Sequence, residues 1–322
     1  MSLAWMAVFQ NIQNINFNLL RVLSLIASST EIVYSLGCGD KLVGRSHECD
    51  FPPDVLDLPY CTEPKFNING SSIEIDNRVK SILQEALSVY RIDEGKLAEL
   101  NPDLIITQSQ CDVCAVSLSD VENAVRKVLG KKPSIVSLEP NQLSDIWADV
   151  KRVATALKVE KRGESIISEM RERIDNLCKM AEDFEKRTVA CIEWIDPMMA
   201  AGNWVPELVQ MAGGINLFGS KGKHSPWMKF EDLIKNDPDV IIVMPCGYNI
   251  DKSNQEMDTL RKMPKWDNLK AVQNGDVFLT DGNQYFNRPG PRLVDSLEIL
   301  MEILYEDKFD FGHKNTGWEK YI

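Results

Sequence analysis

Two cysteines separated by two residues, Cys111 and Cys114, form the sharpest chemical motif in the chain. They follow a predicted strand, at the sheet edge where open α/β folds bind ligands. A thioredoxin-like redox pair would need the motif to open a helix and to carry a lowered thiol pKa. A zinc site would need two further ligands, and His47 with Cys49 offers a suitable mixture of nitrogen and sulfur. The third interpretation is a structural or disulfide-forming loop that shapes the site.

Other catalytic patterns are missing from the sequence. It contains no Walker loop, GxGxxG or HExxH motif, and no serine, histidine and acid in a usable order. Glu74 and Asp76 follow two serines, where acidic residues complement a helix N-terminus rather than act in acid–base catalysis. An enzyme is therefore not indicated. The alternative from that class is a cytosolic zinc- or thiol-dependent enzyme that uses the Cys111/Cys114 loop.

Composition narrows the class further. The chain has 322 residues, 44% hydrophobic and 26% charged, which suits a soluble protein with two full cores. Its net charge of −12 argues against nucleic acid as a partner, because phosphate backbones require clustered Lys and Arg. No apolar run is long enough to span a membrane. The apolar stretch 4–9 is short and lacks a basic flank, so it does not indicate a signal peptide, and we leave open a cytoplasmic location.

The elements that position these residues repeat between the two halves. A helix, an Asn/Asp-Pro-Asp turn and an apolar strand occur once in each half, as LAELNPDLIIT and FEDLIKNDPDVIIV. The β-branched run after each turn favours a buried parallel strand. Apolar residues at i+3/i+4 spacing predict a long helix between the halves. We therefore expect an α/β protein with two Rossmann-like lobes, each a central sheet flanked by helices, joined by a rigid helix with a ligand cleft between them. The predicted segments are a tail at 1–20, a lobe at 21–145, the linker helix at 146–187, a lobe at 188–305 and a tail at 306–322.

The order of these segments resembles one known family. RVLSLIASSTEIVYSLG, VGRSHECDFP, the two repeated units, LVQMAGGINLF and FNRPGPRLVDSLEIL are similar to the substrate-binding proteins of ABC importers that have a helical linker. That group carries cobalamin, haem and iron–siderophores. SSIEIDNRV and TQSQCDVCAVS are most similar to proteins labelled cobalamin-binding. The resemblance implies a non-catalytic monomer that holds a corrinoid in the cleft, requires no cofactor, and delivers the ligand to an ABC permease or an intracellular acceptor. Haem, an iron–siderophore or a metal ion are the alternative ligands, and zinc stays a candidate at the cysteines.

A corrinoid is a flat, largely apolar macrocycle with amide arms, so its site needs aromatic faces and a few hydrogen-bonding groups. Predicted strand-to-helix loops supply such residues from both lobes: His47, Glu48, Tyr90, Trp194, Trp204, Trp227, Tyr285 and Arg288. The resemblance matches Trp227, Tyr285 and Arg288 to ligand-contacting positions, and places Tyr90 close to a family tryptophan. The alternative for each tryptophan is an anchor that packs on its own lobe. One surface carboxylate per lobe docks on the permease in this family. Glu231 matches that position in the second lobe, whereas Gly95, with Glu94 beside it, stands there in the first.

Overall fold

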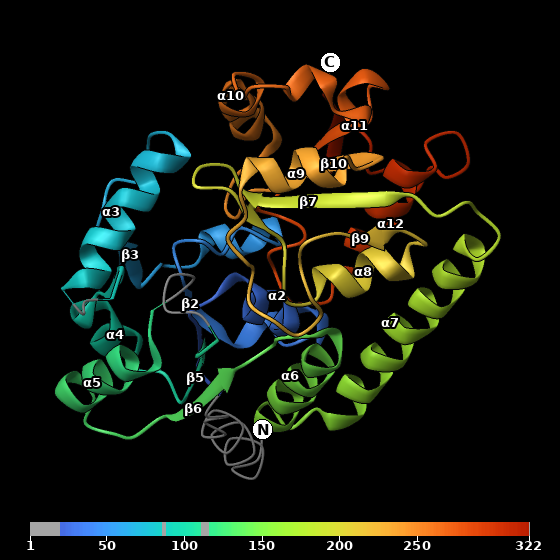
Figure 1. Cartoon of the computed structure of the whole chain (residues 1–322). Coiled ribbons are helices and arrows are strands. Elements are labelled where there is room, and N and C mark those ends of the chain that lie inside the picture. The colour runs from blue at the N-terminus through green and yellow to red at the C-terminus, as the bar shows by residue number, and fades with distance from the viewer. Residues whose placement is uncertain (1–19, 86–87, 111–115, 322) are drawn as a thin grey trace, which may run out of the picture.

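The computed structural model describes residues 20–85, 88–110 and 116–321. Their strands form two main sheets, and a single long helix connects the halves (Figure 1). The predicted fold class, two α/β lobes with a helical linker, is confirmed.

Lobe one is built on four parallel strands in the order β2-β1-β5-β6. These strands are β1 (Val22–Ser24), β2 (Leu42–Arg45), β5 (Leu104–Gln108) and β6 (Ser134–Leu138). The helices of this lobe are α2 (Ala27–Ser35), α3 (Ser72–Gln84), α4 (Glu94–Leu100), α5 (Leu118–Val128) and α6 (Leu143–Ala156). A short hairpin of β3 (Thr62–Pro64) and β4 (Tyr90–Ile92) lies outside the main sheet. Short 3₁₀ turns at Gly39–Lys41 and Pro53–Asp57 complete the lobe.

Lobe two has a sheet in the order β12-β11-β10-β7-β8, with β9 also paired to β7. Its strands are β7 (Thr188–Trp194), β8 (Met199–Ala200), β9 (Ile215–Asn216), β10 (Val240–Val243), β11 (Val277–Thr280) and β12 (Trp318–Lys320). Strands β7, β10 and β11 run parallel, whereas β8 and β12 are antiparallel edge strands. The helices are α8 (Val205–Met211), α9 (Phe230–Asn236), α10 (Ile250–Arg261), α11 (Lys270–Gln273) and α12 (Leu293–Leu304), with a 3₁₀ turn at Trp266–Asn268.

The internal repeat extends to individual hydrogen bonds. Helices α4 and α9 both end in a left-handed residue, Asn101 and Asp237, each followed by proline and a parallel strand. The next acidic residue, Asp103 or Asp239, accepts a hydrogen bond from the backbone N–H at the start of its lobe's first strand, at 3.0 Å and 2.8 Å. Each carboxylate also pairs with a lysine that lies before the following strand. The two lobes therefore use the same local interactions to join one helix–turn–strand unit to its neighbours.

The linker is shorter than the predicted range of 146–187. Helix α6 ends at Ala156, and Lys158 takes a left-handed φ of 60° before α7 begins. The linker proper is α7, Glu160–Ala181, whose 22 residues span about 33 Å at 1.5 Å per residue. Because α6 packs against α2 and β6, it belongs to lobe one. In Figure 1, α7 runs along the outside of the molecule from the lobe-one helix α6 toward the start of β7 in lobe two.

One hydrophobic core continues through both lobes. The buried stripe of α7, at Ile166, Met170, Ile174 and Leu177, joins side chains of α2, α6, α8 and α12 in a single cluster. A large rotation of one lobe against the other would expose this shared core to water, at a cost set by the apolar area involved. The packing favours a rigid relation between the lobes.

The predicted tail at 306–322 is part of lobe two as far as the structure describes it. Strand β12 pairs with β11, and the Trp318 side chain is 2% exposed. Its indole N–H donates to the buried Glu302 carboxylate at 2.5 Å, and its ring packs edge-on against Phe278. These contacts make the segment a structural edge of the second sheet rather than a free tail.

Candidate functional site

In lobe one, the predicted residues His47, Glu48 and Tyr90 lie together. The loop after β2 is fixed by the buried Arg45 guanidinium, which donates to the carbonyl oxygens of the nearby loop residues. The Tyr90 hydroxyl donates to Glu48 Oε1 at 3.0 Å, and the His47 and Tyr90 ring centroids are 5.2 Å apart. His47 Nδ1 lies 2.8 Å from the Thr62 hydroxyl. The loop thus presents an imidazole, a carboxyl and a phenol as one polar and aromatic group.

Burial sets the charge of this group. Burial, aided by the Arg45 charge, lowers the pKa of His47 to about 4, so the imidazole is uncharged at neutral pH. Burial raises the pKa of Glu48, partly offset by the hydrogen bond from Tyr90. Both shifts reduce the charge that the loop carries into the space between the lobes.

In lobe two, aromatic residues follow the carboxyl ends of neighbouring parallel strands. Trp194 ends β7, and Tyr248 lies beyond β10 with its ring centroid 5.2 Å from that of Trp194. The Lys252 ammonium lies 3.9 Å above the Tyr248 ring. Tyr248 was not predicted from the sequence. The signal that could have identified it is its type and place, an aromatic residue a few positions after the repeated strand of lobe two, β10. Its hydroxyl is buried and has no hydrogen-bond partner within the described residues.

Trp227 is the most exposed large hydrophobic side chain of the described chain, at 58%. The ammonium of Lys80, which belongs to α3 of lobe one, lies 5.2 Å from its ring centroid. The two lobes meet again close by, where Glu256 of α10 accepts hydrogen bonds from the backbone N–H and hydroxyl of Ser72, both at 2.9 Å. Trp227 is therefore positioned between the lobes with an accessible face.

A buried ion-pair network links the lobes. Arg288 of lobe two donates to Asp50 of lobe one at 2.5 and 3.1 Å and to Glu31 at 3.3 Å. Arg292 donates to the two oxygens of Glu31 at 2.9 and 2.5 Å. Asn283 and Gln284 add side-chain amide bonds to Asp50 at 3.1 and 2.8 Å. This set, Glu31, Asp50, Asn283, Gln284, Arg288 and Arg292, is called the interlobe network below.

Several predicted site residues are engaged elsewhere. Trp204 is 5% exposed in the shared core, and its indole N–H donates to the Phe286 carbonyl at 2.6 Å. The Tyr285 ring lies edge-on to His313 and 5.3 Å from the Arg292 guanidinium. Arg288 is 6% exposed within the interlobe network. Trp204 therefore has the contacts of an anchor on its own lobe, the alternative stated for the tryptophans, and ligand contact by Tyr285 and Arg288 stays a prediction.

The cysteine motif cannot be placed, because Cys111 and Cys114 lie outside the described residues. Cys49, its suggested partner, is fully buried and accepts a hydrogen bond from the Thr30 hydroxyl at 3.0 Å. Burial raises the pKa of the Cys49 thiol to about 11, which disfavours the thiolate that zinc binds. Within the residues that the structure describes, no three His, Cys, Asp or Glu side chains gather in a way that could hold a metal ion.

The two predicted docking carboxylates both lie in the first turn of a repeated helix, one position apart in the repeat. Glu94 lies in the first turn of α4, and Glu231 in the first turn of α9. Glu94 pairs with Lys127 at 2.6 Å, whereas the Glu231 side chain is exposed. Gly95 follows Glu94 at the position that the resemblance assigns to the carboxylate.

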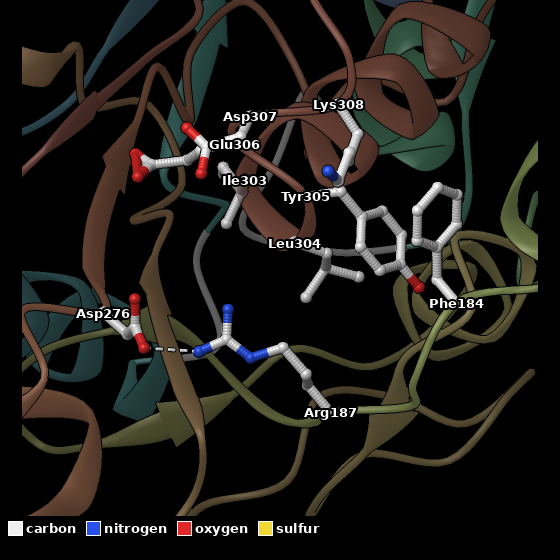
Figure 2. A pocket seen from close by; sticks show the side chains of 9 residues that line it. All are labelled: Phe184, Arg187, Asp276, Ile303, Leu304, Tyr305, Glu306, Asp307 and Lys308. Carbon is white, nitrogen blue, oxygen red and sulfur yellow. Dashed lines mark hydrogen bonds and ion pairs between the residues drawn. The ribbon is translucent and has the colours of Figure 1, made fainter.

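A cavity of about 300 Å³ lies at the opposite edge of lobe two (Figure 2). It is lined by Arg187 and Asp276, which precede β7 and β11, and by the end of α12 with the residues that follow it. A neighbouring cavity of about 390 Å³ shares Arg187 and Tyr305. The Arg187 guanidinium pairs with Asp276, and Phe184 packs on Tyr305 with centroids 4.5 Å apart. Arg187 and Asp276 lie at the amino ends of β7 and β11, whereas Trp194 and Tyr248 lie at or beyond the carboxyl ends of β7 and the neighbouring β10, so the cavity is separate from the interlobe residues.

With this geometry in place, the chain can be assigned to a family: it belongs to the periplasmic binding protein family, which matches residues 22–284. It is 24% identical over 287 residues to the vitamin B12-binding protein of Vibrio cholerae serotype O1, covering 88% of each chain. It is also 21% identical over 295 residues to an uncharacterized ABC transporter substrate-binding lipoprotein, YvrC, of Bacillus subtilis, covering 90% of this chain and 81% of that protein. The haem-binding protein RhuT from Roseiflexus sp. RS-1 has the same fold, with a TM-score of 0.65 and 23% identity over 89% of this chain and 98% of that one.

The family resemblance read from the sequence is thereby confirmed. The chain is a solute-binding protein of the ABC transport family, and members of this family bind and deliver small molecules rather than catalyse reactions. No helix in the described ranges is both long and apolar enough to cross a bilayer.

Proposed function

We propose that this protein binds a corrinoid between its two lobes and delivers it to an ABC permease. The observation that carries the proposal is the placement of aromatic side chains on both sides of the interlobe region, with His47, Trp194 and Tyr248 at or just past the carboxyl ends of parallel strands. His47 and Tyr90 lie in lobe one, and Trp194, Tyr248 and Trp227 in lobe two. Open α/β sheets bind ligands at this edge. The similarity to B12-binding proteins over most of the chain supports the same ligand class.

The chemistry of these groups suits a flat macrocycle with amide arms. Trp227 offers an exposed ring face on which an apolar macrocycle could stack. Glu48 and the uncharged His47 offer hydrogen-bonding groups for amide arms. Burial of a large aromatic contact would supply most of the affinity, and the polar groups would fix the orientation.

We expect delivery to the permease to use the first turns of α4 and α9, one in each lobe. Glu94 on α4 and Glu231 on α9 both lie in the first turns of the repeated helices, so they present carboxylates from both lobes. We propose that arginines of a permease bind them. The pairing of Glu94 with Lys127 makes Glu231 the more available of the two. Changing Glu231 to Lys should abolish uptake with a reconstituted permease and leave ligand affinity unchanged.

The decisive experiment is calorimetric titration of the purified protein with cyanocobalamin and with cobinamide. We expect saturable one-to-one binding of both. Trp227→Ala should weaken it about tenfold or more, as truncation of a central aromatic contact commonly does. Met180→Ala is the matched control, because Met180 is also exposed, at 44%, but lies on the linker helix away from the interlobe residues. The absence of heat and of any visible spectral change with either corrinoid would refute the proposal.

A further inference from the structure

The arginines between the lobes are already neutralised by the protein. The four terminal N–H groups of Arg288 are taken up by Asp50, Glu31 and Asn283. Arg292 donates through Nε and Nη2 to both oxygens of Glu31, and through Nη2 to Gln284 at 2.9 Å. Two guanidinium charges therefore face two carboxylates, and the interlobe network carries no net charge. An incoming anion would therefore find all four terminal N–H donors of Arg288 already taken, and could not bind them as a bidentate pair.

Three other cations near this region are also engaged. Lys80 pairs with Asp76 at 2.7 Å, and the Lys252 ammonium donates to the Ile68 carbonyl at 3.4 Å in the field of Glu256. Arg45 is bonded to carbonyl oxygens of its own loop. Glu48 is a carboxyl of this region without a cationic partner: within the described chain it has no ion pair with any lysine or arginine, and its Oε2 atom accepts no hydrogen bond.

We infer that the interlobe site selects against carboxylate-bearing ligands and takes a neutral or cationic ligand whose rim offers N–H donors. The inference rests on the proposed location of the ligand between the lobes, and it narrows the ligand class within that proposal. An amide-rimmed macrocycle can donate to Glu48 without disturbing any ion pair. A macrocycle with carboxylate arms must either separate Arg288 from Asp50 or bury its charge beside Glu48.

The physical cost explains the selectivity. A buried charge without a partner is strongly unfavourable, and removing one member of a buried ion pair leaves the other uncompensated. Specificity of this kind arises from repulsion and lost pairing for the wrong ligand more than from added contacts with the right one. Glu31 and Asp50 are thus specificity-determining residues, acting through the two arginines that they occupy.

Two pairs of ligands with the same ring and different charge test the inference on the unaltered protein. The first pair is haem and its dimethyl ester, in which esterification removes both carboxylates. The second is cobinamide and a cobyrinic acid, in which carboxylates replace the amides. We expect the uncharged or amide member of a pair to bind at least about tenfold more tightly, which is the range of one charge-assisted hydrogen bond. Equal or tighter binding of the acid member would overturn the inference.

A matched pair of variants assigns the effect to the interlobe network. Asp50→Asn should free donors of Arg288 and improve affinity for the acid member of each ligand pair about tenfold. The difference in affinity between the two members of a pair should therefore become smaller. Asp54→Asn makes the same change of net charge at an exposed site four residues away and should leave the preference unaltered. An unchanged preference in folded Asp50→Asn would overturn the role given to Arg288. Preference for the haem ester without corrinoid binding would support the inference and refute the corrinoid proposal, whereas failure of all four ligands would overturn both.

Discussion

Replacing Glu31 with Gln should destabilise the protein far more than the same change at an exposed ion pair. The Glu31 side chain is 3% exposed and accepts three guanidinium hydrogen bonds from two arginines of the other lobe. Gln keeps the shape and one acceptor oxygen but removes the negative charge. Arg292 then has no carboxylate, because its remaining acceptor is the Gln284 amide.

The magnitude follows from the geometry. Hydrogen bonds to charged groups contribute about 1.5–3 kcal/mol each, but they are not additive, and removing one partner of a buried pair typically costs about 3–5 kcal/mol. We therefore expect Glu31→Gln to lower the free energy of unfolding by about 3–5 kcal/mol, a large share of the 5–15 kcal/mol typical of a folded protein. Urea unfolding at pH 7, followed by circular dichroism and tryptophan fluorescence, would measure it.

Glu63 provides the control. It pairs with Arg91 at 2.5 Å, as close as the buried contacts, but the two side chains are 46% and 60% exposed. Solvent and salt screen such a pair, so Glu63→Gln should leave the urea midpoint unchanged within error. The double variant of Glu31→Gln with Arg292→Gln should be less destabilised than the sum of the single changes. Equal effects of the Glu31 and Glu63 changes would refute the reasoning from burial.

Three further predictions concern regions outside the interlobe network. Trp318→Ala should cost about 3–5 kcal/mol in urea unfolding, the usual range for a fully buried aromatic, and Trp318→Phe should cost less because it loses mainly the indole hydrogen bond. The hydrogen bond to Glu298 raises the pKa of His313 above its ordinary value of 6.5. The His313–Glu298 pair therefore stabilises the protein fully below pH 6.5, and this stabilisation is lost as the pH rises through the pKa of the folded state. In urea midpoints measured across this pH range, His313→Gln should show a smaller decline with rising pH than the unaltered protein. Alkylation of the native protein at pH 8 should label the exposed Cys246 and spare the buried Cys191, because burial raises the pKa of the Cys191 thiol. Mass spectrometry of the peptides would locate the label. Equal labelling of the two cysteines would contradict the placement of β7.

The hydrophobic pattern and turn residues of the sequence were sufficient to predict the repeated strands and helices of the two lobes. Strand β7, Thr188–Trp194, and helix α8, Val205–Met211, follow strong local signals, a run rich in β-branched residues and an apolar helix with proline in its first turn. Helix α10 was missed although Ile250, Met257 and Leu260 have helical spacing. Its remaining buried position is Ser253, and the segment is otherwise polar, so it lacked the apolar content of a recognisable amphipathic helix.

The candidate site was only partly predictable for a different reason. His47, Glu48 and Tyr90 were identified by type, and the structure brings them together through the hairpin β3–β4. The partners of Arg288 could not be inferred, because Glu31 and Asp50 lie 257 and 238 residues away in the chain. A pattern within one sequence contains no signal for contacts of that separation. Strand β12 was missed similarly, since three residues become a strand only through pairing with β11.

The central claim is that this solute-binding protein holds a corrinoid between its lobes. Equilibrium dialysis of the purified protein against cyanocobalamin, read by the visible absorbance of the corrinoid, tests it most directly. One equivalent of cyanocobalamin should be retained at saturation by the unaltered protein, and less by Trp227→Ala. Equal corrinoid concentration on both sides of the membrane, with folded protein present above the micromolar range, would contradict it.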